Sequence, residues 1–152
     1  MNIVLLLHIL AVFVSFAFTT GTGITLAAIA NTGDVRAIRT AARAMRPMMA
    51  AGGILLLLGV IFGFGMAQMS GFALGATWLV VTYIAVALLF AFGLGVHMPW
   101  VAKVRAAASA SPDDAPSAEL QTLLGDRFVR AAGPISGLLW LVILSMMVFR
   151  PS

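Results

Sequence analysis

Residues 3–30 read IVLLLHILAVFVSFAFTTGTGITLAAIA, a run of 28 residues without Asp, Glu, Lys or Arg. A transmembrane α-helix needs about 20 consecutive, mostly apolar residues. A run this long and this apolar is typical of a helix that crosses a lipid bilayer, so it decides the fold class. Three further stretches of the same kind follow, at about residues 48–69, 77–101 and 131–149.

Composition points the same way. Hydrophobic residues make up 62% of the 152 residues, and charged residues only 9%. A soluble domain carries about 25% charged residues, so this chain has too few charges to cover a water-facing surface. The absence of cysteine excludes disulfides, thiolate metal sites and cysteine nucleophiles. We therefore expect one all-α domain over residues 1–152, a bundle of four transmembrane helices surrounded by the lipid bilayer.

The basic residues are confined to segments outside the apolar stretches. Four arginines precede the second stretch, and four more basic residues, from Lys103 to Arg130, separate the third from the fourth. Segment 70–76, between the second and third stretches, carries no charge. Because basic loops stay in the cytoplasm, we predict that both termini and segment 70–76 lie outside. Arg150 is the one basic residue that does not fit this orientation. We expect a multi-pass protein of the bacterial inner or plasma membrane.

The segment before the second stretch is basic and amphipathic. Asp34 is a suitable N-cap for a helix that continues to Arg46, and Pro47 suits the first turn of the next helix. We expect a helix that lies on the inner membrane surface and binds anionic lipid. A docking face for an acidic partner is the alternative, and we expect no nucleic acid partner. The basic residues of this helix are spaced three, four and three apart: Arg36, Arg39, Arg43 and Arg46.

Glycine pairs and tryptophans predict helix packing. Gly59 with Gly63, and Gly133 with Gly137, form GxxxG pairs, which let two helices approach closely in lipid. The pattern does not say whether the contact is within one chain, in a homo-oligomer or in a larger membrane complex. Trp140 falls near the middle of the fourth stretch. We expect it to pack against a neighbouring helix, the alternative being that it lines a pocket.

No Asp, Glu, Lys or Arg lies within the apolar stretches, which leaves two histidines. Intramembrane ionisable residues are candidates for function. His8 lies near the outer end of the first stretch, and His97 lies near the inner end of the third. The predicted depth difference is about 20 Å at 1.5 Å per residue, so one haem held by both is not expected. His8 is the candidate ligand, with a structural role as the alternative, and His97 is expected to be structural or lipid-facing.

Methionines share the outer layer with His8. An imidazole and a thioether together are suited to haem iron or to Cu(I). The alternative is that these flexible side chains only fill gaps between helices. The candidates lie at the outer ends of the second and fourth stretches: Met66, Met69, Met146 and Met147.

The chain resembles a family of predicted bacterial integral membrane proteins of unknown function. The resemblance rests on residues 7–10 (LHIL), the basic segment before the Gly-rich second stretch, and the run from Gly71 to Lys103 that includes Trp78. That family is more distantly similar to the copper-resistance D proteins and to the HemJ type of protoporphyrinogen oxidase. Both carry an early Leu-His pair, and in the HemJ type that histidine is associated with haem. The resemblance therefore implies haem or porphyrin at His8.

Three functions are consistent with these patterns. The first is a membrane bundle that binds haem b or a related tetrapyrrole through His8 for electron transfer. The second is a non-catalytic accessory or assembly subunit of a membrane complex. The absence of charged groups from the core and the many small residues favour it. The third is a copper-handling protein that uses His8 and the outer methionines. Whether the protein is an enzyme is left open by the sequence.

Overall fold

The computed structural model describes residues 2–150, which form helices and turns and contain no strand. The helices are α1 (Asn2–Ala30), α2 (Val35–Met69), α3 (Thr77–Phe92), the π-helical turn η1 (Gly93–His97), α4 (Met98–Ala110), α5 (Ala118–Leu124) and α6 (Arg127–Phe149). Helix α3, η1 and α4 follow one another without a break. By length and composition, four helices are able to cross a membrane: Ile3–Ala30, Val35–Met69, Thr77–Ala110 and Ala118–Phe149. The predicted four-helix membrane fold is confirmed.

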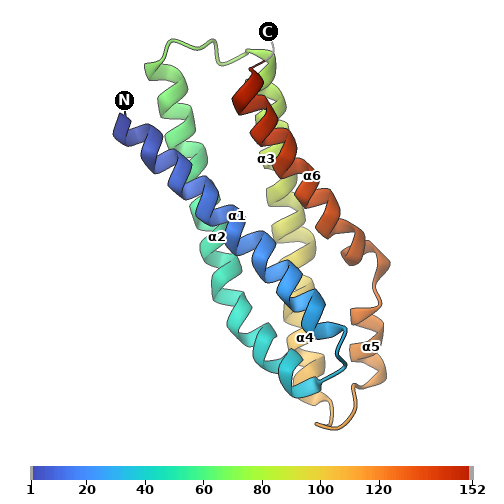
Figure 1. The fold of residues 1–152 in the computed structure, drawn as a ribbon. Helices are drawn as coiled ribbons and strands as arrows, with labels where there is room; N and C mark the ends of the chain where they lie inside the picture. Colours follow the sequence, from blue (N-terminus) through green and yellow to red (C-terminus); the bar gives the residue numbers. More distant parts are fainter. Residues whose placement is uncertain (1, 151–152) are drawn as a thin grey trace.

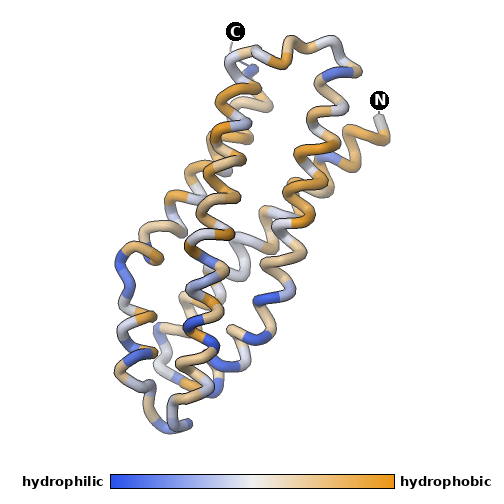
Figure 2. Tube along the Cα trace, turned by 180° about the vertical axis from the view of Figure 1, so that it is seen from behind, coloured by the Kyte–Doolittle hydropathy of each residue, from blue (hydrophilic) through white to orange (hydrophobic). Residues whose placement is uncertain are grey.

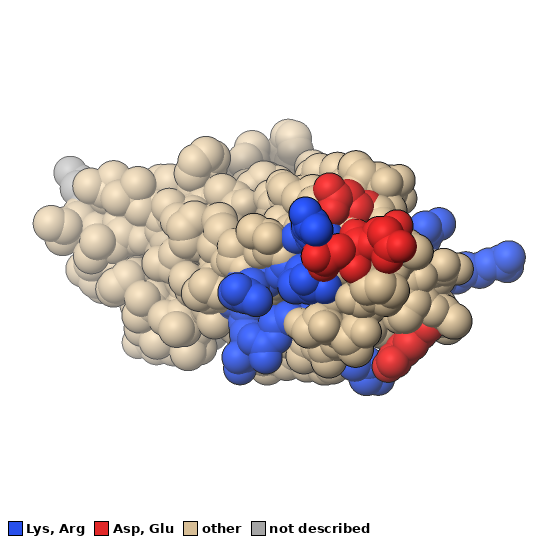
Figure 3. All heavy atoms as spheres, turned by 90° about the horizontal axis from the view of Figure 1, so that it is seen from below, with Lys and Arg blue, Asp and Glu red and all other residues tan. Residues whose placement is uncertain are grey.

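The bundle has two different ends (Figure 1). The start of α1, the end of α6 and the turn at residues 70–76 lie at one end, which we name the terminal end. The loop at residues 31–34, the loop at residues 111–117 and α5 lie at the other, which we name the basic end. Figure 2 shows most hydrophilic positions near the basic end. Figure 3 shows that basic and acidic side chains gather there side by side.

Helix α2 is longer than the predicted span at residues 48–69. It runs unbroken for 35 residues, about 52 Å, with Pro47 inside it. Asp34 caps it as predicted, since its side chain accepts a hydrogen bond from the Ala37 amide at 3.0 Å. The prediction of a separate helix lying on the membrane surface is wrong. The apolar face of this segment is buried against α4 and α5 rather than in lipid: Val35, Ile38 and Ala42 pack with Val104, Ala107, Ala108 and Leu120.

A second apolar cluster joins all four spans near the middle of their length. Its buried residues include Leu56 of α2, Leu89 of α3 and Trp140 of α6. Trp140 is 3% exposed, and its ring meets that of Phe16 of α1 edge to face at 5.4 Å between centroids. The expected packing role of Trp140 is therefore confirmed. We name this group of residues the central cluster.

The third span contains the π-helical turn η1, in which the Met98 amide donates to the Gly93 carbonyl. Pro99 follows directly. Proline has no N–H to offer the carbonyl four residues back, and its ring clashes with that carbonyl. A wider turn at Gly93–His97 relieves the clash, and such turns are tolerated as single bulges inside α-helices. His97 is half-buried at the end of this turn.

Candidate functional site

His8 lies in the interface between α1 and α2 near the terminal end. Its side chain is buried, with 6% of the residue exposed. The ring nitrogen Nδ1 is 2.7 Å from the Gly59 carbonyl oxygen. A carbonyl oxygen only accepts hydrogen bonds, so Nδ1 is the donor, and in the neutral imidazole Nε2 keeps a lone pair. This is the orientation in which imidazoles commonly bind metals, one nitrogen on the metal and the other on a carbonyl.

The glycines of α2 make room for this ring. A Cβ atom added at Gly63 would lie 2.8 Å from Cε1 of His8, closer than real side chains approach. A Cβ atom at Gly59 would lie 2.7 Å from Cγ2 of Val12, one turn further along α1. The Gly59 and Gly63 pair is therefore used inside one chain, between α1 and α2. The sequence left this choice open.

The same interface continues toward the basic end through hydroxyl groups. Ser15 is fully buried and donates a hydrogen bond to the Gly52 carbonyl at 2.8 Å. A Cβ atom at Gly52 would meet Thr19 Cγ2 at 2.9 Å. Small residues of α2 thus contact polar side chains of α1 over about three helical turns. Hydrogen bonds of this kind join helices in lipid, where an unpaired polar group is costly.

Tyr83 is a polar residue that the sequence reasoning missed. Its hydroxyl oxygen is buried and has no hydrogen-bond partner among the described residues. It is the one tyrosine of the chain and stands in an uncharged stretch, which was the available signal. Tyr83 lies six residues from the start of α3, and His8 six residues from the start of α1. Since both helices start at the terminal end, the two side chains lie in the part of the bundle nearest that end.

Three helices contribute to the layer between the central cluster and the terminal end. His8 is four residues before Val12, and Tyr83 is three residues before Val86, toward the terminal end in both cases. Met147 of α6 packs directly against the central cluster. Residues three or four apart on a helix share a face. The His8 imidazole and the Tyr83 phenol therefore lie about one turn beyond the central cluster, and the Met147 thioether packs against that cluster.

The remaining predicted residues lie in other surroundings. Met66 and Met146 are half-buried, and Met69 is 59% exposed at the last residue of α2. His97 lies 20 residues from the start of α3, about 30 Å from the terminal end, whereas His8 lies about 9 Å from it. The two histidines therefore lie at different depths. Within residues 2–150 no three His, Asp or Glu side chains gather closely enough to hold a metal ion.

A network of charged groups lies at the basic end. Arg39 donates from Nε and Nη2 to the Ala108 carbonyl, at 3.1 and 3.0 Å, and from Nη2 to the Ser111 carbonyl at 3.1 Å. Its Nη1 lies 3.0 Å from Oδ1 of Asp113, and Arg36 lies 2.9 Å from Oδ2. The hydrogen bond from Arg39, then that from Arg36, lowers the pKa of the Asp113 carboxyl below its usual value. Arg39 was predicted to bind lipid, but its contacts are with the protein.

A search of curated proteins found no match to this chain, and a search of solved structures found none either. A family model does match. It is described as a predicted integral membrane protein, DUF2269, and it covers residues 2–151. That range includes all four spans and both ends of the bundle. The chain therefore belongs to the DUF2269 family of integral membrane proteins.

Proposed function

We propose that this multi-pass membrane protein binds haem b or a related tetrapyrrole through Nε2 of His8, near the terminal end, for electron transfer. One observation carries the proposal: the 2.7 Å contact between Nδ1 of His8 and the Gly59 carbonyl. That contact fixes the ring and leaves Nε2 with a lone pair for iron. A backbone carbonyl is among the usual partners of the second nitrogen of a metal-bound histidine.

Two further groups support the proposal. Met147 supplies a thioether, which is a known second axial ligand to haem iron beside histidine. Tyr83 supplies a hydroxyl that has no partner among the described residues, and a porphyrin carboxylate or ring edge would give it one. A bound haem would supply one-electron redox chemistry, while the chain would supply the ligand and exclude water. The likeness of Leu7 and His8 to the HemJ type points to the same group.

Access to His8 needs a change of packing. The residue is 6% exposed, so a large planar ligand reaches Nε2 only if neighbouring helices separate near the terminal end. The ribbons of α2 and α3 stand apart there and are joined by the turn at residues 70–76 (Figures 1 and 2). We place the ligand in the layer beyond the central cluster, because separation there would leave that cluster intact.

The absorption spectrum tests the proposal. The protein is purified from haem-replete cells as wild type and as the variants His8→Ala, His97→Ala, Met147→Leu and Met69→Leu. We expect a Soret band in the wild type that is lost in His8→Ala and kept in His97→Ala. Met147→Leu should shift the visible bands, whereas the exposed Met69 provides a matched control whose replacement leaves the spectrum unchanged.

Other outcomes identify the other functions. A wild type that is colourless and takes up no added haem contradicts the proposal. If that protein carries copper that is lost in His8→Ala, a Cu(I) site of imidazole and thioether ligands replaces it. If it carries neither haem nor copper, an accessory or assembly subunit becomes the leading function. His8 is then a structural residue whose hydrogen bond joins α1 to α2.

A further inference from the structure

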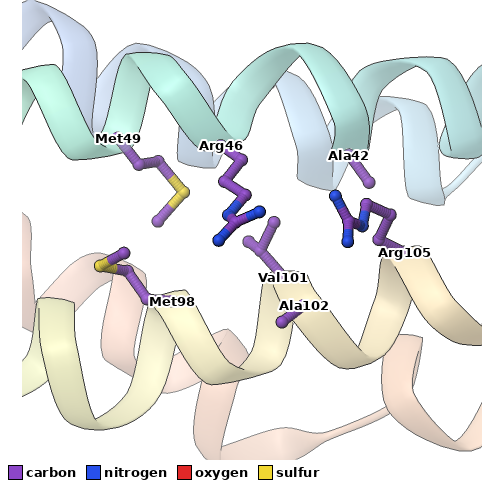
Figure 4. A pocket seen from close by; sticks show the side chains of 7 residues that line it. All are labelled: Ala42, Arg46, Met49, Met98, Val101, Ala102 and Arg105. Carbon is purple, nitrogen blue, oxygen red and sulfur yellow. The ribbon is translucent and has the colours of Figure 1, made fainter.

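A small pocket lies between α2 and α4 at the basic end (Figure 4). Its volume is about 120 Å³. Arg46 reaches from α2 toward α4, and Arg105 reaches from α4 toward α2, so two guanidinium groups enter one space. The other side chains that line it are apolar: Ala42, Met49, Met98, Val101 and Ala102.

The two arginines of this pocket lack a negative partner. No carboxylate lines the pocket, and neither guanidinium forms an ion pair or hydrogen bond with another residue in the range 2–150. Three acidic residues are engaged elsewhere. Asp34 and Asp126 cap helices, and Asp113 binds Arg36 and Arg39. Two positive groups that share an uncompensated pocket repel each other, and an anion bound between them removes that repulsion.

The side chains that line the pocket change in character along the two helices. Helices α2 and α4 run in opposite directions, so Met49 faces Met98 on the membrane side and Ala42 faces Arg105 on the water side (Figure 4). Arg46 lies 23 residues before Met69, about 35 Å along α2. Since the hydrocarbon core of a bilayer is about 30 Å thick, the guanidinium groups lie at the level of the lipid headgroups. The methionines lie at the level where acyl chains begin.

We infer that this pocket binds the phosphate of an anionic phospholipid headgroup, with Arg46 and Arg105 as the ligands. Guanidinium groups bind phosphate oxygens in bidentate fashion, which a pair of arginines on facing helices allows from two sides. The apolar side of the pocket, at Met49 and Met98, suits the first part of an acyl chain. Free phosphate would use only the basic half. The inference does not depend on a haem at His8.

Lipid binding to the full chain in detergent tests this site. Native mass spectrometry measures the affinity for phosphatidylglycerol, phosphatidylcholine and inorganic phosphate. We expect the double variant Arg46→Gln, Arg105→Gln to bind phosphatidylglycerol roughly tenfold more weakly than wild type, from the loss of charged hydrogen bonds. The matched control is Arg43→Gln, Lys103→Gln. It removes the same charge from the same two helices at exposed residues outside the pocket, and should change the affinity less than twofold.

The remaining outcomes are decisive. Equal weakening in both double variants would overturn the site in favour of general surface charge, and unchanged binding in the pocket variant would overturn it outright. Inorganic phosphate that binds as tightly as phosphatidylglycerol would overturn the lipid assignment. The variant Arg46→Lys, Arg105→Lys keeps the charge but loses the planar fork. It should fall between wild type and the Gln variant, and full affinity there would exclude recognition by guanidinium geometry.

Discussion

The two ends of this bundle are held together in different ways. At the basic end, Val35, Ile38, Ala42, Val104 and Leu120 are each 1% exposed or less, and they form one apolar core. Toward the terminal end, large apolar side chains such as those of Leu6, Phe13 and Phe64 are exposed on the outside of the bundle. There α1 and α2 are joined by the His8 and Gly59 hydrogen bond and by close approach at Gly63.

This difference follows from the two solvents. Helix α2 is about 52 Å long, so its first turns extend beyond a hydrocarbon core of about 30 Å. Apolar side chains in water gain free energy by burial, whereas in lipid they gain little, because acyl chains are equally apolar. Only 17–22% of the most apolar window of each span is buried within the protein. Packing there depends on small residues and polar contacts.

The first prediction, which has the largest expected effect, concerns the side of the membrane that each end faces. The loop charges predict a cytoplasmic basic end and an external terminal end. A reporter fused at the C-terminus should be active only as an external reporter, and one inserted near Ser111 only as a cytoplasmic reporter. The opposite result for both fusions would invert the orientation, and the Arg46 and Arg105 pocket would then face the outer leaflet.

The second prediction breaks the contact that joins α1 and α2 in lipid. Gly63→Ala places a methyl group 2.8 Å from the His8 ring. We expect the free energy of unfolding to fall by about 1–3 kcal/mol, as for other overpacked sites. Thermal unfolding in detergent measures it. Gly65→Ala, on the same helix with open space around its Cβ position, is the control and should be near neutral.

The oligomeric mass of Gly63→Ala distinguishes two models of this interface. Because Gly63 contacts His8 of its own chain, the mass in detergent should stay unchanged while the stability falls. A smaller species with unchanged stability would mean that Gly63 faces another copy of the chain. The description of the terminal end as a contact within one chain would then be wrong, and the description of the basic end would be unaffected.

Sequence periodicity was sufficient for the spans but not for the helix ends. The four apolar runs predict the four membrane helices because lipid demands long uncharged helices. The surface helix before Pro47 was predicted wrongly for a local reason. Its apolar face, with Ile38 and Ala42, suits lipid and protein equally well, and only the presence of α4 and α5 decides between them. A proline inside a helix is also hard to distinguish from one in a first turn by sequence alone.

Part of the candidate site could be predicted from the sequence. His8 stood out as an ionisable residue in lipid, and GxxxG pairs predicted close helix contact. That the two features form one contact, His8 against Gly63, depends on the register between α1 and α2, which a single sequence does not contain. Tyr83 gave almost no signal, because an isolated tyrosine in an apolar run resembles any core aromatic. Its importance comes from the buried hydroxyl.

The third prediction weakens the polar contacts at the basic end. Arg39→Ala removes the hydrogen bonds to the carbonyls of Ala108 and Ser111 and the ion pair with Asp113. We expect a loss of about 1–2 kcal/mol, since the group is charged but partly exposed. Urea unfolding in detergent and the rate of proteolysis at residues 111–117 measure it. Arg43→Ala, an exposed neighbour, should change neither by a measurable amount.

The fourth and smallest effect concerns the pH dependence of the same end. Contacts with Arg39 and Arg36 lower the pKa of Asp113 in the folded protein below the value of 3.8 that applies when unfolded. The ionised carboxylate therefore stabilises the fold above about pH 4, and this contribution disappears as the pH falls through the lower, folded pKa. Because the side chain is exposed, salt should screen the effect.

The measurement compares the melting temperatures of wild type and Asp113→Asn between pH 7 and pH 3. The difference should be constant above pH 5, shrink toward pH 3 and decrease at high salt. Arg39 is the main cause of the shift, so the same comparison made in Arg39→Ala should show a smaller difference at every pH. A difference that stays constant down to pH 3, or persists in Arg39→Ala, would show that Asp113 stabilises the loop without the arginine. The ion pair between Arg39 and Asp113 would then contribute nothing to the stability of the basic end.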